Sequence, residues 1–280
     1  MKPPLIDVIL PVYNAGSTLR DAVESILKQS FEDFRIFLID DGSDDDSPVI
    51  CEQLCRQDPR IIYIANIQNR GLVTRLNEGL KLCTAPYVAR MDADDISFPD
   101  RFQLQLDYLI ANPHAVACSG SYQCINANGD MFAIHIANNR NPNLRAIPAE
   151  PHFLLHPLLM MRRNAVVKIG GYRNVLHCED ADLYYRLAEH GKLHNLTEVL
   201  GLYRVHNASV SMITESNRII QCLNSQVLAL CAFQKTRKNT RLNTGCKALK
   251  YIAEHAVKAI AEKKLSLTAA TDQPQSHIRL

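Results

Sequence analysis

The sequence lacks several features that define large classes of protein. No apolar run in its 280 residues approaches the ~18 that a membrane-spanning helix needs. The apolar run in the opening MKPPLIDVILPVYN is also too short for a signal peptide. Its nine cysteines form no CxxC pair and no His–Cys spacing typical of zinc ligands. We therefore expect a cytoplasmic chain with reduced core thiols, rather than a disulfide framework or a zinc protein.

Two common nucleotide-binding motifs are also absent. Neither the phosphate-binding loop GxxxxGK[ST] nor the dinucleotide fingerprint GxGxxG occurs, so ATP hydrolysis and dinucleotide redox chemistry are not supported. There is no internal repeat and no linker rich in Gly, Ser or Pro. We expect one globular domain over residues 1–212 and an extension over 213–280.

The extension differs from the body in charge. Residues 1–234 hold 21 basic and 26 acidic side chains, whereas residues 235–264 hold nine and two. Apolar residues from Leu249 to Ile260 recur there at helical spacing among lysines, which predicts a basic amphipathic helix. This helix can dock on the body or attach the protein peripherally to an anionic inner membrane face. No aromatic platform accompanies the charge, so nucleic acid is not an expected partner.

The first half of the sequence alternates between two patterns. Short runs of Ile, Val, Leu and Phe are typical of strands that a parallel sheet buries on both faces, and the segments between them have apolar residues at helical spacing. This alternation predicts an open α/β sheet, whose ligands bind beyond the carboxyl ends of the strands. The expected strands are 5–11, 35–40, 61–66 and 86–91, and the expected helices are 17–29, 47–57, 72–83 and 99–112.

The alternation stops near residue 115. A hairpin around Asn128-Gly129 predicts a mixed rather than purely parallel sheet. We further expect a strand over 156–163, a helix over 179–191 ended by Gly191, and a strand over 198–206. At two helix starts, Ser17 or Thr18 should be the cap of the first helix, and Pro99 should lie in the first turn of the fourth.

Three carboxylates, Asp92, Asp94 and Asp95, follow the fourth strand in MDADD. Clustered carboxylates either lie in water or hold a cation. An EF-hand is excluded, because counting from Asp92 it would need Gly and Glu where Ser97 and Gln103 stand. Carboxylates in a short crevice loop suit Mg²⁺ or Mn²⁺ with open positions for substrate phosphates, which implies a nucleoside diphosphate derivative as substrate.

Seven ordered motifs resemble those of the inverting family 2 glycosyltransferases with the GT-A fold, a Rossmann-like mixed sheet flanked by helices. They are VILPVYNAGSTLRDAVESILKQSFEDFRIFLIDDGSDD, NRGLVTRLNEGL, YVARMDADDISFPDR, HPLLMMRR, IGGYR, EDADLYYRL and YRVH, and they cover roughly residues 5–210. The resemblance implies transfer of a sugar from a nucleotide-diphosphate sugar to a glycan or lipid-linked acceptor. A UDP-sugar is the expected donor. Surface polysaccharide or lipopolysaccharide biosynthesis is the implied setting.

The same resemblance implies roles for individual residues of the donor site. Asp41 would accept a hydrogen bond from the N3–H of uracil. Thymine carries the same donor, and cytosine has none. Asp92 would bind the ribose or the metal and Asp94 the metal itself, with His206 completing the metal site, while Asp95 would cap the next helix. The remaining nucleotide contacts would come from Pro11, Val12, Tyr13, Asn14, Arg70, Arg75 and Asn77.

The catalytic base is expected in CEDADLYYRL. Acidic residues are common in a first helical turn because the helix dipole favours them there, so their enrichment alone does not identify the base. In the family the aspartate directly after the glutamate is the base, which implies Asp180, with Glu179 as the alternative. His156 could contact the acceptor or the pyrophosphate, Gly170 and Gly171 would allow a tight turn, and Arg186 would be a structural partner.

Two other functions stay open from the residues alone. A sugar-phosphate nucleotidyltransferase also uses a metal and an α/β sheet, but it would need a basic residue in a Gly-rich N-terminal loop, and PVYNAGS has none. A non-catalytic binding protein derived from the fold is the other alternative, and the presence of Asp94 and Asp180 disfavours it.

Overall fold

A computed structural model describes residues 3–137, 154–175, 177–205 and 227. The predicted basic helix and His206 therefore lie outside the described residues, as does all of the 213–280 extension apart from residue 227. No helix in the described ranges has both the length and the apolar character that a membrane crossing requires.

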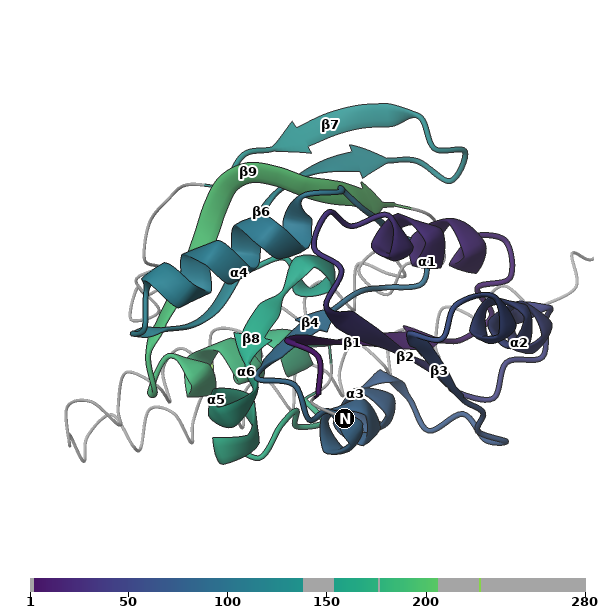
Figure 1. Cartoon of the computed structure of the whole chain (residues 1–280), viewed down its shortest axis with the longest axis horizontal. Coiled ribbons are helices and arrows are strands. Elements are labelled where there is room, and N and C mark those ends of the chain that lie inside the picture. The colour runs from purple at the N-terminus through teal and green to yellow at the C-terminus, as the bar shows by residue number, and fades with distance from the viewer. Residues whose placement is uncertain (1–2, 138–153, 176, 206–226, 228–280) are drawn as a thin grey trace, which may run out of the picture.

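The first half forms the predicted alternation of strands and helices (Figure 1). Each expected strand and helix is present, with ends shifted by at most two residues. The helix predicted over 47–57 has exactly those bounds, and Pro48 stands in its first turn, where its missing N–H costs nothing. The elements are β1 (Ile6–Val12), α1 (Leu19–Leu27), β2 (Phe34–Asp40), α2 (Ser47–Gln57), β3 (Ile61–Ile64), α3 (Leu72–Leu82) and β4 (Tyr87–Arg90).

The second half confirms the hairpin and the last helix but differs in detail. The hairpin turns at Gly129, whose φ of 91° favours glycine. The elements are β5 (Ile96–Ser97), α4 (Arg101–Ala111), β6 (Ala115–Ile125), β7 (Met131–His135), η1 (His156–Leu158), β8 (Met160–Arg162), α5 (Arg163–Lys168), α6 (Glu179–Leu187) and β9 (Lys192–Arg204).

The sheet is mixed, as the hairpin predicts. Its strand order is β3-β2-β1-β4-β8-β6-β9-β5, with β7 paired to β6. Strands β1 to β4 are parallel to one another, and β1 pairs with β2 over its whole length, from Ile6 opposite Phe34 to Val12 opposite Asp40. Strand β8 is antiparallel to both β4 and β6, so the direction changes directly beside β4. The carboxyl ends of β1, β2 and β4 therefore meet at one edge.

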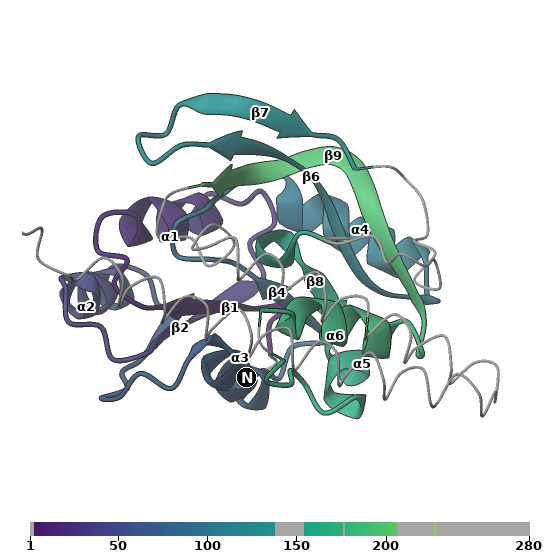
Figure 2. The same ribbon diagram turned by 180° about the vertical axis from the view of Figure 1, so that it is seen from behind.

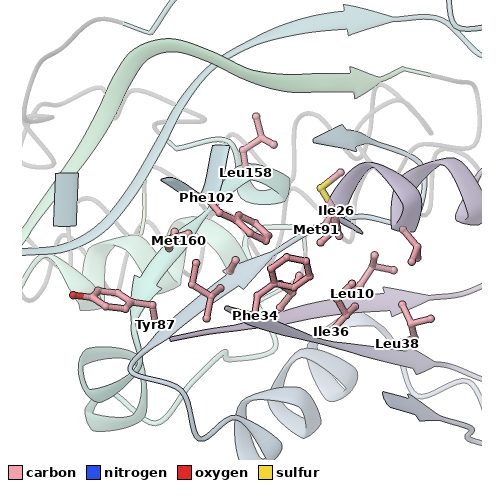
Figure 3. Packing of buried hydrophobic residues seen from close by; sticks show 14 of the residues in the cluster. Leu10, Ile26, Phe34, Ile36, Leu38, Tyr87, Met91, Phe102, Leu158 and Met160 are labelled. Atoms are coloured by element: carbon pink, nitrogen blue, oxygen red, sulfur yellow. The ribbon is translucent and has the colours of Figure 1, made fainter. Parts of the chain in front are cut away.

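Helices cover the sheet on both sides (Figures 1 and 2). Residues of α1, α2 and α4 pack against one face in a cluster that includes the edge-to-face pair of Phe34 and Phe102, 5.5 Å between ring centres (Figure 3). Residues of α3, α5 and α6 pack against the other face in a second cluster. The sheet is thus buried on both sides, which explains the near-continuous apolar character of its central strands.

Several expected boundaries were wrong. The strand predicted over 156–163 is a 3-10 turn, the short strand β8 and the start of α5, because Pro157 cannot donate to a sheet ladder. Helix α6 ends at Leu187 rather than at Gly191. Strand β9 begins at Lys192, earlier than the expected residue 198. Pro99 precedes α4, which begins at Arg101.

The cap of α1 also differs from the prediction. Thr18 occupies the N-cap position, but its side chain makes no capping hydrogen bond. Its hydroxyl instead donates to the carbonyl oxygen of Ala93 at 2.9 Å, inside the loop that follows β4. Thr18, which was expected to cap its own helix, therefore binds the loop that contains Asp92, Asp94 and Asp95.

Candidate active site

The loops after β1 and β2 hold one another at the carboxyl edge of the sheet. The N–H of Asn14 donates to the hydroxyl of Ser43 at 3.0 Å, and the amide oxygen of Asn14 accepts the N–H of Asp44 at 3.0 Å. Asn14 has a φ of 49°, a conformation that asparagine tolerates better than most residues. Of the predicted nucleotide contacts in this segment, Tyr13 is half exposed, while Val12 is buried in the core.

Asp45 fixes the same pair of loops from the other side. Its carboxylate accepts the N–H of Gly16 at 2.8 Å and the N–H of Ser47 at 2.9 Å. Partial burial raises the pKa of Asp45, but the hydrogen bonds from Ser47 and Gly16 outweigh burial and lower that pKa below its usual value. Hydrogen bonds therefore hold the segment DDGSDDDS in a defined conformation, although Asp44, Asp45 and Asp46 are exposed to solvent.

Asp41 is buried and receives three hydrogen bonds from the segment that follows β3. Its Oδ1 accepts the N–H of Arg70 at 2.8 Å and Nε of Arg75 at 2.6 Å, and its Oδ2 accepts the N–H of Gly71 at 2.8 Å. The structure thus brings together three predicted nucleotide residues, Asp41, Arg70 and Arg75. Within the described residues, Oδ2 accepts only one of these bonds, which leaves it room for a second donor.

Arg75 is nearly fully buried, and three of its nitrogen atoms contact the protein itself. Besides Asp41, it donates from Nη1 to Glu78 at 2.9 Å and from Nη2 to the carbonyl of Gln68 at 2.7 Å. Burial lowers the pKa of Arg75, but the hydrogen bonds to Glu78 and Asp41 more than compensate and raise it. Arg75 therefore orients Asp41, whereas the side chain of Arg70 is exposed at the rim.

Asn77, a predicted donor contact, is bonded to the backbone of the GGYR turn. Its side-chain amide donates to the carbonyl of Tyr172 at 3.0 Å and accepts the N–H of Tyr172 at 2.9 Å. This reciprocal pair ties α3 to the GGYR turn. That turn contains Gly170 and Gly171, whose φ values of 79° and 71° confirm the tight turn predicted there.

The three aspartates after β4 lie together. Asp92, Asp94 and Asp95 each offer a carboxylate oxygen, and these atoms all lie within 4.8 Å of one another. Asp92 is paired with the buried Arg90, from Nη1 to Oδ2 at 2.6 Å and through a second contact from Nη2 to Oδ1. The predicted cluster therefore forms, with one of its members already neutralised by an arginine.

Asp95 does not cap α4. It is buried, and its Oδ1 accepts the N–H of Arg204 at 2.7 Å, while the Nε of Arg204 donates to the carbonyl of Asp94 at 2.8 Å. The end of β9 is thus fastened to the acidic loop, and His206 follows two positions later in the sequence, outside the described residues. Oδ2 of Asp95 has no hydrogen-bond partner among the described residues.

The electrostatics of this cluster favour a cation. Burial raises the pKa of Asp92, an effect that Arg90 opposes and Asp94 adds to. Burial, followed by the charges of Asp92 and Asp94, raises the pKa of Asp95 well above its usual value. A divalent cation among these oxygens would relieve the repulsion and give the unpartnered Oδ2 of Asp95 a charge to face. Oxygen donors of this kind fit Mg²⁺ or Mn²⁺.

The first turn of α6 supplies the second acidic group. Asp182 is buried and paired with Arg186, from Nε to Oδ2 at 2.7 Å. Arg186 also donates to the carbonyl of Gly171 at 2.7 Å, which confirms its predicted structural role. Asp182 is thereby committed to the fold. Glu179 and Asp180, in the same turn, are only half buried.

Glu179 and Asp180 are the two acidic residues of the first turn of α6 other than Asp182. Burial, and then the charge of Asp180, raises the pKa of Glu179, and the charges of Arg90 and Asp92 also act on it. Hydrogen bonds link α6 to the GGYR turn and that turn to His156: Arg186 of α6 donates to the carbonyl of Gly171, and the hydroxyl of Tyr172 is bonded to His156. The first turn of α6 thus holds two half-buried carboxylates, of which Glu179 has a raised pKa.

His156 is buried and forms a polar cluster with Tyr172. Its Nε2 is hydrogen-bonded to the hydroxyl of Tyr172 at 2.9 Å, and the two rings are 5.4 Å apart. Burial, assisted by the charge of Arg90, lowers the pKa of His156 well below its usual value, so the imidazole is neutral. Burial raises the pKa of Tyr172, which therefore stays protonated.

Sequence reasoning missed two residues of this cluster, Arg90 and Tyr172. Arg90 did leave a signal, since a charged residue inside an otherwise apolar strand is rarely buried without a partner. Tyr172 left none, because its contacts come from Asn77 and His156, which are distant in sequence.

The fold and the site define an α/β protein of the GT-A type with three clustered aspartates after β4, at the carboxyl edge of its sheet. Comparison with known proteins agrees: residues 7–170 match the model of Glycosyl transferase family 2. The chain belongs to this family. It is 33% identical over 217 residues to EpsE of Bacillus subtilis, covering 74% of each chain. It is 31% identical over 216 residues to the O-antigen biosynthesis glycosyltransferase WbnJ of Escherichia coli, covering 73% of this chain and 81% of WbnJ.

Solved structures share the fold at lower identity. The mannosyltransferase PcManGT of Pyrobaculum calidifontis, in complex with GDP-Man and Mn²⁺, superposes with a TM-score of 0.62 at 16% identity, covering 96% of this chain and 81% of that one. S. aureus TarS 1–349, in complex with UDP-GlcNAc, gives a TM-score of 0.63 at 16% identity. That match covers 82% of this chain and 66% of the TarS chain, slightly less than two thirds.

Proposed function

We propose that this glycosyltransferase moves a sugar from a UDP-sugar to a glycan or lipid-linked acceptor with inversion at the anomeric carbon. The observation that carries the proposal is that the Asp41 pocket and the Asp92–Asp95 cluster lie at the carboxyl ends of the parallel strands β2 and β4. The acidic helix α6 is tied through Arg186 to the GGYR turn, which bonds His156. WbnJ supports surface polysaccharide or lipopolysaccharide biosynthesis as the setting, because its name assigns it to O-antigen biosynthesis.

The donor base is assigned to the Asp41 pocket. Arg75 and the N–H groups of Arg70 and Gly71 hold the Asp41 carboxylate, and Oδ2 has room to accept the N3–H of uracil. Pro11, Val12, Tyr13 and Asn14 would line the pocket, with Arg70 at its rim. Guanine presents a comparable N–H, and the solved structures with this fold include TarS with UDP-GlcNAc and PcManGT with GDP-Man. UDP- and GDP-sugars are therefore compared directly.

The metal is assigned to the acidic loop. Asp94, with Asp92 and His206, would hold Mn²⁺ or Mg²⁺, which when bound supplies positive charge beside the donor diphosphate. Arg90 neutralises Asp92 in the described contacts, so Asp94 is the principal ligand in this assignment. The Mn²⁺ in the PcManGT complex supports Mn²⁺ as the first ion to test.

The base is assigned to Asp180, with Glu179 as the alternative. The acceptor hydroxyl gives its proton to the Asp180 carboxylate while its oxygen forms a bond to the anomeric carbon. The bond from that carbon to the phosphate oxygen breaks, and the nucleoside diphosphate leaves with the electron pair. Direct displacement inverts the anomeric configuration, because no enzyme-linked sugar intervenes. His156, neutral and bonded to Tyr172, would stand beside the acceptor or the pyrophosphate.

The division of the chain is part of the proposal. Residues 1–212 would form the catalytic domain, and residues 213–280 a helical basic extension. The protein would act in the cytoplasm, and the extension would bring it to the inner membrane face, where lipid-linked acceptors are found.

A hydrolysis screen tests the proposed activity. The protein is incubated with UDP-, GDP- and CMP-sugars and Mn²⁺, and the released nucleotide is measured. We expect UDP release from at least one UDP-sugar, its dependence on Mn²⁺, and its loss in Asp94→Ala but not in Asp107→Ala, which changes an exposed aspartate on α4. Nucleotide release that is equal in Asp94→Ala and the unaltered protein would refute the proposed site.

A further inference from the structure

Arg90 is the last residue of β4, and three neighbouring elements fix its backbone. It lies opposite Ile9 of β1, its N–H donates to the carbonyl of Leu159 at 2.9 Å, and its own carbonyl accepts Nη2 of the buried Arg101 at 2.7 Å. The side chain is 3% exposed. The guanidinium therefore starts from a rigid point at the edge where the strands end.

The guanidinium grips Asp92 at both terminal nitrogens. Nη1 lies 2.6 Å from Oδ2, and Nη2 contacts Oδ1, which is the two-point geometry that a carboxylate and an arginine favour. Among the described residues, Nε has no partner. A buried arginine with one carboxylate partner has little freedom to reorient, so Asp92 is held in one orientation at the mouth of the site.

We propose that Arg90 is a positioning residue: its two-point grip holds the carboxylate of Asp92 in one orientation for the donor. The inference rests on the proposed function. It assigns Arg90 no contact with substrate. Its effect should therefore pass through Asp92 and appear first in donor binding.

Arg90→Lys tests the grip, because lysine keeps the charge but cannot bind a carboxylate at two points. Calorimetry with UDP and Mn²⁺ should show an affinity loss of about 10- to 100-fold, the usual range for hydrogen bonds to a charged group. Arg162→Lys is the matched control. Arg162 also ends a strand, and it donates to the carbonyl of Ala115 at 2.8 Å, among other partners at the opposite end of β4. The Arg162→Lys variant should bind UDP with unchanged affinity.

A double-substitution cycle separates positioning from general damage. If Arg90 acts through Asp92, then Arg90→Lys should cost far less affinity in an Asp92→Asn background than in the unaltered protein. Equal losses in both backgrounds would overturn the inference. Should Arg90→Lys fail to fold, Arg90→Gln, which is neutral and donates one hydrogen bond, replaces it with the same expected loss.

The two proposals fail in different ways. If the unaltered protein binds no UDP with Mn²⁺ and releases no nucleotide, the proposed function is wrong and the inference falls with it. If the unaltered protein binds UDP and Arg90→Lys binds it equally well, only the role of Arg90 is wrong. Unchanged UDP affinity in Arg162→Lys with a reduced affinity in Arg90→Lys supports the inference.

Discussion

Nε of Arg75 lies 2.6 Å from Oδ1 of Asp41, and both side chains are almost completely buried. The same arginine donates from Nη1 to Glu78 and from Nη2 to the carbonyl of Gln68, so each of its three side-chain nitrogens has a partner within the protein. A residue type that is often assigned to phosphates is here committed to orienting the carboxylate proposed to recognise the base.

Arg75→Lys should therefore weaken donor binding without removing a donor contact. Lysine cannot reproduce the three directed bonds, so Asp41 loses its orientation. We expect UDP affinity to fall about tenfold and the unfolding free energy to fall by about 1–3 kcal/mol. Calorimetry and denaturant titration measure the two effects. Glu78→Gln, which changes a different partner of Arg75, should leave UDP affinity within about twofold. A tenfold loss of UDP affinity in Glu78→Gln would contradict the proposal that Arg75 acts through Asp41.

Asp94→Ala should separate function from stability. Removing one of three crowded carboxylates relieves repulsion with Asp92 and Asp95, so we expect an unchanged or raised melting temperature. Mn²⁺-dependent UDP binding should disappear, because the charge beside the diphosphate is lost. Calorimetry with UDP in the presence and absence of Mn²⁺ gives the answer. Undiminished Mn²⁺-dependent affinity would remove Asp94 from the metal site.

Asp180→Asn should leave donor binding intact and remove the proposed base. The substitution preserves shape, so kcat should fall by about 10²- to 10⁴-fold with little change in the KM for the donor. Steady-state kinetics with a defined acceptor measures this, and Glu179→Gln is the matched comparison. Near-normal turnover in Asp180→Asn together with a large loss of kcat in Glu179→Gln would identify Glu179 as the base instead of Asp180.

Burial of neutral His156 predicts a pH-dependent stability. Because its pKa is lowered in the folded protein, the unfolded chain binds more protons as pH falls below about 6.5, and stability declines in that range. His156→Gln should reduce this decline by at most about 1.4 kcal/mol per pH unit. Denaturant unfolding at pH 7.5 and pH 5.5 tests this, with exposed His114→Gln as the control. Identical declines in the unaltered protein and His156→Gln would show that His156 does not contribute.

The sequence predicted the first half of the fold better than the second, for a physical reason. Strands β1, β2 and β4 are buried on both faces and α2 is bounded by its own turn residues, so local pattern determines them. Strand β9 starts earlier than expected because Lys192–Thr197 is polar and pairs with β6 in an irregular register. Its strand form comes from a partner distant in sequence, which a local pattern does not contain.

The site follows the same division. The carboxylates after β4 and at the start of α6 were identified from residue type and position, and the structure clusters the three after β4 and places the others in the first turn of a helix. Their partners were not identified. Asn77 binds Tyr172 across 95 residues of sequence, and Arg204 binds Asp95 across 109. Such pairs depend on tertiary geometry, so the sequence alone assigned Asn77 to the donor and Asp95 to a helix cap.

The basic extension provides the last prediction. Its lysines at 247, 250, 258, 263 and 264 accompany an apolar stripe in the sequence, and each basic residue near an anionic membrane contributes on the order of 1 kcal/mol. We expect the full chain to float with liposomes containing anionic lipid at low salt and to be released at high salt, because salt screens surface charge.

Changing all five lysines to glutamine should abolish flotation, whereas changing all five to arginine should preserve it, since only the charge is needed for attraction to the lipid surface. An apolar stripe that docks on the body would be scarcely sensitive to salt. Absence of flotation for the unaltered chain, or equal flotation of the glutamine variant, would therefore favour docking on the body over membrane attachment.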